Sequence, residues 1–420
     1  MYLKSRNTLL NRNNIILIFF ALLFLNYLFF NYRILFRGNG YILGDWLLNY
    51  SGGFVRRGLI GHIFYLISNF FNISIIHIIF LFSSSIYFIS LYFFYQIIKS
   101  KLNNNLILIF IFLPSTFLFN FFDPLTVGRK EILVFFFFSF YFLYLDKINL
   151  NLNFKIFTLF LIIIFILTHE IIFFLIPFLF VLKYFHIQKL NLKSYYLEIL
   201  IFLFGLIITI MIMIFSHQHN NSLLCSSLNN VGLSTDLCYG IINEFGSSST
   251  KSKNLLSTVP LGYFLERNYF KNYSIYFFLS AIPLALMILR SKASFINKVI
   301  FTSLSFFCLL FSVIFFAKVN DWGRYLNIFF LLQFLITLKF IELNPIENDI
   351  KFKVFKVLKI FTLLLYLSTW HMPHCCNPNL GIGYYDVYNR IVARLYDEST
   401  NSTKYKDLPR TFLRKLLKIE

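Results

Sequence analysis

Long apolar runs follow one another along the chain, and charged residues, prolines or clusters of asparagine bound each run. The runs lack the period-of-two alternation that a membrane β-barrel requires, so the pattern predicts helices. A helix that crosses a bilayer uses about 20 residues. The runs predict about eleven helices, at residues 15–36, 73–98, 106–121, 132–145, 154–167, 171–185, 195–215, 275–289, 299–316, 325–340 and 357–370. The shorter ones can end in a cavity lined by protein.

The composition is typical of a membrane protein and excludes two other classes. Of the 420 residues, 58% are hydrophobic and 13% are charged, whereas a soluble domain typically carries about 25% charge. This excludes a water-soluble enzyme, and so much apolar surface also excludes a disordered chain. We therefore expect an all-α fold, a polytopic transmembrane helical bundle.

Most of the positive charge lies between the apolar runs, where it fixes the orientation of the helices in a membrane. The net charge is +20, and Lys and Arg occur mostly in short clusters between apolar runs, a pattern that fixes orientation in a membrane rather than binding nucleic acid. Lys4, Arg6 and Arg12 precede the first helix and place the N-terminus in the cytoplasm. Alternate connections carry the further anchors Lys99, Lys101, Lys147, Lys155, Lys183, Lys189, Lys193, Arg290, Lys292, Lys298, Lys351, Lys353, Lys356 and Lys359.

This orientation divides the chain into a bundle, residues 1–374, and a basic amphipathic tail, residues 375–420. An odd number of helices puts the tail outside, as we expect, and an even number puts it inside. The tail either lies on the membrane surface or packs on the bundle. The long connection 216–274 lies outside and either covers a substrate or is a passive connector. It contains Cys225 and Cys238, and a disulfide between them is expected outside the cytoplasm.

The remaining connections, all on the outer side, hold the unusual polar residues. They fall in five connections: Gly44-Asp45-Trp46 followed by 49–58, which includes Ser-Gly-Gly-Phe-Val-Arg-Arg-Gly at 51–58; Phe122-Asp123-Pro124 followed by Gly128-Arg129-Lys130-Glu131; Thr168-His169-Glu170; Asn320-Asp321-Trp322-Gly323-Arg324-Tyr325; and His371-Met372-Pro373-His374. Acids, arginines and histidines therefore gather on one face, and simple lysine anchors gather on the other.

Three of these connections place arginine next to glycine. Gly52 and Gly53 permit close approach of the backbone to a ligand, and Arg56 or Arg57 supplies a guanidinium that suits phosphate or pyrophosphate. The alternative is an arginine pair at the lipid headgroups. The same theme recurs at two further connections, in Arg129 with Lys130 and in Arg324. For Arg324 the alternative is a local ion pair with Asp321. Convergence of three such loops predicts a polyanion site.

Candidate general bases lie on the same face. His169 and Glu170 interrupt an apolar stretch and are the first choice, and Asp45 and Asp123 are rivals. Asp321 is a further catalytic candidate. Cysteine and histidine spacing does not resemble a zinc site. His371 and His374 have no acid close in the sequence, so we expect no metal and no cofactor.

The segment 51–58 and the motifs Gly128-Arg129-Lys130-Glu131, His169-Glu170 and Asp321-Trp322-Gly323-Arg324 are similar to motifs of Wzy-type O-antigen or capsular polysaccharide polymerases. The multispan pattern with one long late external loop also resembles that family. The resemblance implies a multi-pass enzyme of the bacterial inner membrane that acts on undecaprenyl-diphosphate-linked oligosaccharide repeat units at the periplasmic face. One departure is that the long loop here follows the seventh expected helix, and its residues match no family pattern.

Our hypothesis is therefore polymerisation of lipid-linked repeat units by glycosyl transfer. Arg56, Arg129 and Arg324 stabilise the leaving pyrophosphate, and His169 or Glu170 deprotonates the acceptor hydroxyl. The partners are the lipid-linked oligosaccharide and the bilayer, and a chain-length regulator stays an open possibility. One alternative is a C-type glycosyltransferase that uses a polyprenyl-phosphate sugar, which this chain resembles in having an acid, Asp45, after its first helix. The other is a flippase or transporter of the same glycan.

Overall fold

The computed structural model describes residues 12–188, 191–216, 220–233, 238, 242, 261–318, 321–346 and 363–375. Most of the basic tail, much of the long connection and the first part of the helix expected at 357–370 lie outside the described residues. The described part contains no β-strand, and one isolated antiparallel bridge joins Ser291 and Ile346. The expectation of an all-α fold is confirmed for this part.

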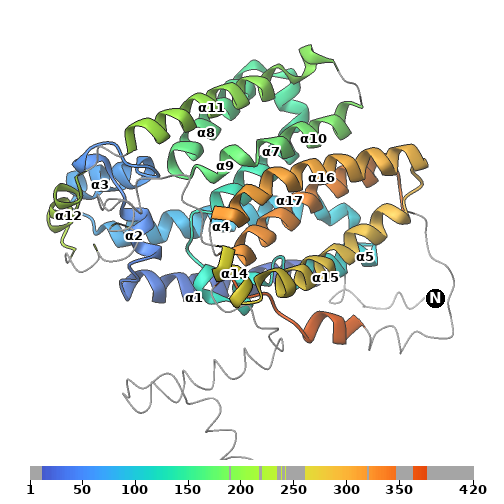
Figure 1. Cartoon of the computed structure of the whole chain (residues 1–420), viewed down its shortest axis with the longest axis horizontal. Coiled ribbons are helices and arrows are strands. Elements are labelled where there is room, and N and C mark those ends of the chain that lie inside the picture. Colours follow the sequence, from blue (N-terminus) through green and yellow to red (C-terminus); the bar gives the residue numbers. More distant parts are fainter. Residues whose placement is uncertain are drawn as a thin grey trace, which may run out of the picture.

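Among the described residues, ten helices have twelve residues or more. One of them, α3 (Leu59–Phe71), lies beyond one end of the bundle, and the other nine lie roughly side by side (Figure 1). They are α1 (Arg12–Phe36), α4 (Ile75–Ile98), α7 (Ile132–Leu150), α8 (Leu152–Thr168), α10 (Ile176–Ile187), α11 (Tyr196–Phe215), α15 (Tyr269–Leu289), α16 (Phe295–Lys318) and α17 (Trp322–Leu343). The elements that connect these nine are α3 and the shorter α2 (Ile42–Leu47), η1 (Tyr50–Gly52), η2 (Lys99–Lys101), α5 (Asn105–Ile111), α6 (Phe119–Phe122), η3 (Pro124–Thr126), α9 (Ile171–Phe174), η4 (Leu192–Tyr195), α12 (Asn221–Asn229) and α14 (Leu261–Glu266).

Within the described residues, seven segments are long and apolar enough to cross a membrane. They are α1, α4 with η2, α7, η4 with α11, α15, the part of α16 up to Val313, and α17. Three further apolar segments are shorter: α3, α8, and α9 with α10. The helical bundle and its membrane character are therefore present, and the total of eleven spans stays a prediction.

Burial shows which helices lie at the centre. In the most apolar window of α17, 83% of residues are buried, and in α7 61% are buried, but only 28% in α1 and 17% in α16. Helices such as α1 and α16 therefore turn apolar side chains outwards, as helices in contact with lipid do. The central position of α17 matters because its first turn carries Arg324.

Two helices expected from the pattern are broken at prolines. The expected helix 106–121 ends at Ile111 and resumes only as α6, because Pro114 lacks an N–H and cannot continue a helix. The side-chain amide of Asn327 in α17 donates to the carbonyl oxygens of Ser115 and Thr116, at 2.8 and 2.9 Å, and so satisfies buried carbonyls that lie in the break between the two helices. The expected helix 171–185 is also interrupted, at Leu175. Pro177 has no N–H to donate to the carbonyl oxygen of Phe173 four residues earlier, and its ring clashes with that carbonyl.

Helix α3 is an element that the pattern did not predict, because Gly61, His62 and Ser68 dilute its hydrophobicity. A Cβ at Gly61 would lie 2.1 Å from the carbonyl oxygen of Leu48 and 2.4 Å from that of Trp46. Only glycine therefore lets α3 pack directly on the chain around α2. Together with α12, these two short helices lie beyond one end of the long helices (Figure 1).

The two ends of the bundle differ in their charged residues. One end carries α2, α3 and the turns that precede α7, α9 and α17. At the other, Lys101 pairs with Glu342 at 2.8 Å, and Lys339 pairs with the same carboxylate at 2.8 Å. Since α17 has 22 residues, its two ends lie roughly 33 Å apart.

Candidate functional site

Arg57 lies in the chain between α2 and α3, and its side chain contacts the turn between α8 and α9. Arg57 has φ 64°, a left-handed conformation that is uncommon for a residue with a Cβ. Its Nε donates to both carboxylate oxygens of Glu170, at 3.0 and 2.8 Å, and its Nη2 donates to Oε1 at 2.8 Å. This bidentate ion pair fixes both side chains. It joins two segments that lie 113 residues apart in the sequence.

Asp45 of α2 lies between two cations. Its Oδ1 is 3.7 Å from Nη1 of Arg57 and 3.8 Å from Nζ of Lys130. Lys130 is fully buried, donates to the carbonyl oxygen of Arg57 at 2.8 Å, and has its Nζ 5.6 Å from the centre of the Trp46 ring. The Trp46 indole N–H in turn donates to the carbonyl oxygen of Gly128. Asp45 is only 3% exposed, yet its Oδ1 accepts no hydrogen bond.

The first turn of α17 joins the same region through Arg324. Its Nη1 donates to Oε1 of Glu131 at 2.6 Å, and its Nη2 pairs with Asp321. His169 approaches Glu131 from the turn after α8, with Nε2 3.6 Å from Oε1. The local Asp321–Arg324 pair considered from sequence is therefore present, and it is one link of a larger set.

These eight residues form what we call the charged network. It comprises Asp45, Arg57, Lys130, Glu131, His169, Glu170, Asp321 and Arg324. The structure brings together residues from four of the five polar connections recognised in the sequence, at one end of the bundle. Three polar atoms in the network are buried without a hydrogen bond: Asp45 Oδ1, His169 Nδ1 and Arg324 Nε.

Ion pairing with arginine determines the direction in which the pKa values of Glu170 and Glu131 are shifted. Burial acts to raise the pKa of Glu170, but Arg57, with Arg56 and His169 nearby, outweighs it and holds that pKa well below its ordinary value. Burial likewise opposes ionisation of Glu131, but Arg324, His169 and Arg129 hold its pKa well below the ordinary range. Burial lowers the pKa of Lys130 to about 8, against the attraction of Asp45.

These contacts weaken the expectation that Glu170 is a general base. All its hydrogen bonds to Arg57 stabilise the ionised form, and a carboxylate with a lowered pKa is a poor proton acceptor. His169 is 1% exposed, so its ring is poorly accessible to a substrate. Asp321 is bound to Arg324, and Asp45 is flanked by two cations.

Arg129 differs from the other expected arginines. It is half-buried, and its Nε approaches the Leu125 carbonyl oxygen at 3.5 Å. No carboxylate of the described residues lies within 4 Å of its guanidinium. Burial and the charge of Arg324 lower its pKa, although an arginine stays charged at neutral pH. Arg56 is half-buried and lies close enough to Glu170 to influence its titration.

The glycine turn is used differently from what we expected. Gly53 has φ 109°, but its N–H donates to the carbonyl oxygen of Tyr50 at 3.1 Å. It therefore closes the η1 turn and is not a donor to an anion. Gly52 is buried, and its carbonyl oxygen accepts the Asn220 N–H at 2.7 Å.

Helix α12 of the long connection packs on this turn. Asn49 donates to the Ser227 hydroxyl oxygen at 3.3 Å. Cys225 and Cys238 are joined by a disulfide that ties α12 to the following chain. The part of the long connection that the structure describes is therefore more than a passive connector, since it holds the loop that carries Arg57.

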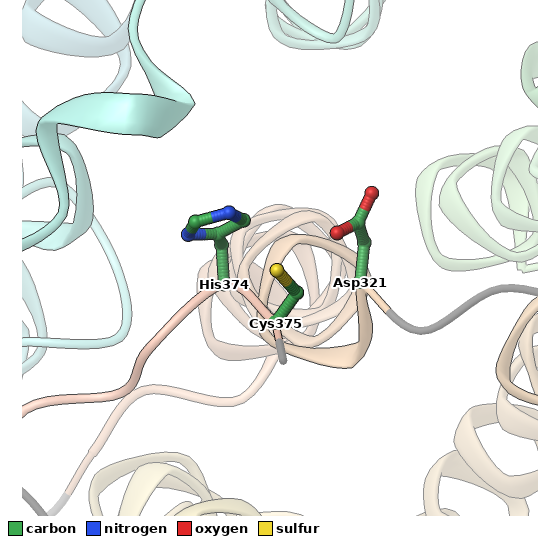
Figure 2. Close-up of side chains that lie close together, drawn as sticks. All are labelled: Asp321, His374 and Cys375. Carbon is green, nitrogen blue, oxygen red and sulfur yellow. The ribbon is translucent and has the colours of Figure 1, made fainter. Parts of the chain in front are cut away.

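One group of side chains has the spacing of a metal site. Ligand atoms of Asp321, His374 and Cys375 lie within 4.8 Å of one another, and Figure 2 shows the three side chains side by side. Cys375 is bonded in a disulfide, so its sulfur is not a thiolate. Asp321 pairs with Arg324, and the His374 Nδ1 lies 2.7 Å from Asp123. These residues therefore do not fit a metal centre.

Sequence reasoning missed two features of the site. Glu131 was not selected, although it follows Arg129 and Lys130 in the same turn. His374 was set aside for lack of a nearby acid, whereas the fold places Asp123 against it. The position of Glu131 was visible in the sequence. The contact between Asp123 and His374 was not, because 251 residues separate them.

Comparison with family models, curated proteins and solved structures found no match to this chain.

Proposed function

We propose that this protein is a glycosyltransferase that polymerises undecaprenyl-diphosphate-linked oligosaccharide repeat units at the periplasmic face of the bacterial inner membrane. One observation carries the proposal. Arg57, Arg129 and Arg324, from three separate turns, gather with buried carboxylates at one end of a bundle of apolar helices. A lipid-linked saccharide presents its phosphates at this depth, because its polyprenyl chain stays in the hydrocarbon.

The charges suit a diphosphate that leaves during the reaction. Arg57 and Arg324 are already fixed by carboxylates, so they need no reorganisation when charge develops. Arg129 has no carboxylate partner within 4 Å among the described residues and lies near enough to Arg324 for the Arg324 charge to lower its pKa. Preorganised donors aimed at developing charge lower the barrier most in a site with little water.

The proposed reaction forms one bond and breaks one. The oxygen of an acceptor sugar hydroxyl bonds to the anomeric carbon of the donor glycan. The bond from that carbon to the diphosphate oxygen breaks, and its electron pair leaves with the lipid diphosphate. A base takes the hydroxyl proton, and Arg129 with Arg324 stabilises the leaving group.

A second candidate is a transferase that uses a sugar linked to polyprenyl monophosphate. Asp45, on the short helix after α1, favours it, since its Oδ1 is buried without a hydrogen bond. Pairing of Arg57 and Arg324 also leaves less positive charge for a second phosphate.

Purified protein in liposomes separates these candidates. It is incubated with undecaprenyl-diphosphate-linked repeat units, or with polyprenyl-phosphate sugars plus an acceptor, and the products are analysed by mass spectrometry. Chains of several repeat units support the polymerase. Addition of one sugar from the monophosphate donor supports the second candidate. Movement of lipid-linked glycan across the bilayer without a new glycosidic bond overturns both and identifies a transporter.

The phenotype of a deletion strain gives an independent test. Loss of a polymerase leaves single repeat units on lipid A core, whereas loss of a single-sugar transferase leaves chains that lack one sugar. Labelling of single cysteines placed at the α2–α3 turn and at η2 tests which end of the bundle faces the periplasm.

A further inference from the structure

Beside the charged network lies a second pair of acid and base, Asp123 and His374. Nδ1 of His374 lies 2.7 Å from Oδ2 of Asp123, and the backbone N–H of His374 donates to the same oxygen at 2.8 Å. Asp123 follows the last residue of α6, and His374 belongs to the segment 371–375. The carboxylate therefore holds both the backbone and the ring of His374.

The segment around His374 is fixed from two further sides. The Gly323 N–H donates to the carbonyl oxygen of His374 at 3.1 Å, and the Tyr273 hydroxyl donates to that of Pro373 at 3.1 Å. A Cβ at Gly323 would lie 2.0 Å from the Pro373 carbonyl oxygen, so only glycine permits this contact. The ring is thus held against the first turn of α17.

This arrangement leaves Nε2 as the reactive nitrogen. An ionised carboxylate only accepts hydrogen bonds, so Nδ1 carries the proton and Nε2 a lone pair. Among the described residues Nε2 makes no hydrogen bond, and it is not enclosed. The side chain is 13% exposed, compared with 2% for that of His169. An acid, an oriented imidazole and an accessible nitrogen are the arrangement that general-base catalysis needs.

The pair also lies next to the residues expected to meet phosphate. Ligand atoms of His374 and Asp321 lie within 4.8 Å (Figure 2), and Asp321 binds Arg324. The ring is therefore separated from the Arg324 guanidinium by a single carboxylate. A proton acceptor in this place is adjacent to the charge that develops on a leaving diphosphate.

We propose that His374, oriented by Asp123, is the general base of the reaction, a role we had expected of His169 or Glu170. This inference rests on the proposed function. The acceptor hydroxyl oxygen attacks the anomeric carbon, its proton passes to Nε2 of His374, and the diphosphate leaves with the electron pair of the broken bond. The imidazolium then returns its proton to water. Asp123 is a positioning residue that fixes the tautomer and stabilises the imidazolium.

The test is the liposome assay with undecaprenyl-diphosphate-linked repeat units, comparing wild type, His374→Asn and His169→Asn. An asparagine amide takes the place of Nδ1 and keeps the hydrogen bond to Asp123, but it lacks Nε2. A general base contributes typically 10²–10⁴-fold to rate. We expect His374→Asn to lower the rate of polymer formation at least 100-fold, with an unchanged thermal unfolding midpoint, and His169→Asn to lower it less. A His374→Asn rate within tenfold of wild type overturns the assignment and shows that the ring only anchors the segment.

Should His374→Asn fail to fold, Asp123→Asn gives the second test, because it leaves His374 in place. Loss of the Asp123 charge leaves the His374 ring without its fixed tautomer, so we expect kcat for polymerisation to fall at least tenfold while KM for the lipid-linked donor stays unchanged. A full kcat, or a loss that appears only in KM, overturns the inference. If wild type itself forms no polymer, the proposed function fails, whereas an active wild type with an active His374→Asn leaves that function intact.

Discussion

Buried ion pairs occur at both ends of the bundle, and they are built differently. Away from the charged network, Lys183 of α10 donates to both carboxylate oxygens of Glu198 in α11, at 3.0 and 2.9 Å, and the Tyr141 hydroxyl donates to the same carboxylate. All three residues are at most 3% exposed. In the charged network, by contrast, eight residues from five segments share ion-pair partners, and three buried polar atoms make no hydrogen bond.

The difference separates a structural pair from a candidate site. A buried charge is costly unless its partner and hydrogen bonds satisfy it, and the Lys183–Glu198 pair meets this condition internally. The charged network does not, because Asp45 Oδ1, His169 Nδ1 and Arg324 Nε stay without hydrogen bonds. A buried polar atom without a hydrogen bond needs an explanation, such as strain, a catalytic role, or a bound water or ion. Four predictions test this comparison.

The largest effect is expected at the structural pair. Lys183→Met leaves the Glu198 carboxylate buried without its cation and should lower the free energy of unfolding by about 3–5 kcal/mol. The double variant Lys183→Met/Glu198→Gln removes both charges, keeps a partner for Tyr141, and should recover most of this loss. Thermal unfolding in detergent measures both. Polymer formed per folded molecule should stay at the wild-type level, since Lys183 lies roughly 14 Å along the helix axis from Phe174, the last residue of α9. A double variant no more stable than the single one would contradict the assignment.

The Arg57–Glu170 pair should respond differently to the same design. Arg57→Ala leaves the Glu170 carboxylate, which is 13% exposed, without its cation. It should lower the free energy of unfolding by about 3 kcal/mol. It should also lower the polymerisation rate about 100-fold, the usual effect of removing one preorganised donor. In the double variant Arg57→Ala/Glu170→Ala, stability should return while activity stays low. Recovery of activity together with stability would show that this pair is structural like the first.

The sequence allowed the helices and the face that carries the polar residues to be predicted. It did not allow the contacts between residues far apart in the chain to be predicted. Apolar runs located the long helices, and alternation of connections placed the polar clusters on one face. The breaks at Phe112–Leu118 and at Leu175 come from prolines visible in the sequence. Helix α3 was missed because Gly61, His62 and Ser68 dilute its hydrophobicity. Partners within the site could not be derived. Arg57 reaches Glu170 only through its left-handed backbone, and the Asp123–His374 pair depends on Gly323 admitting the segment 371–375.

Lys130 allows the network to be probed by pH. Burial lowers its pKa to about 8 from an ordinary value of 10.5, so between these pH values the unfolded chain binds more protons than the folded one. Stability therefore rises with pH across this window. The free energy of unfolding of wild type minus that of Lys130→Met should increase by up to about 3 kcal/mol from pH 8 to 10.5. The difference isolates Lys130, because all other groups titrate in both proteins. Parallel stability curves would contradict a buried, charged Lys130.

The smallest effect is expected at Arg129, and it tests the comparison most directly. Its guanidinium has no carboxylate partner within 4 Å among the described residues, so Arg129→Gln should change the free energy of unfolding by less than about 0.5 kcal/mol. A charge-assisted hydrogen bond to phosphate contributes about 1.5–3 kcal/mol, so KM for the lipid-linked donor should rise about tenfold or more. Inorganic diphosphate should inhibit the variant more weakly by the same factor.

Arg37→Gln is the matched control, since Arg37 is exposed just after α1 and its loss removes the same charge. If both substitutions raise KM equally, the effect is general attraction of an anion; if only Arg129→Gln does, the cation without a carboxylate is the one that meets the phosphate.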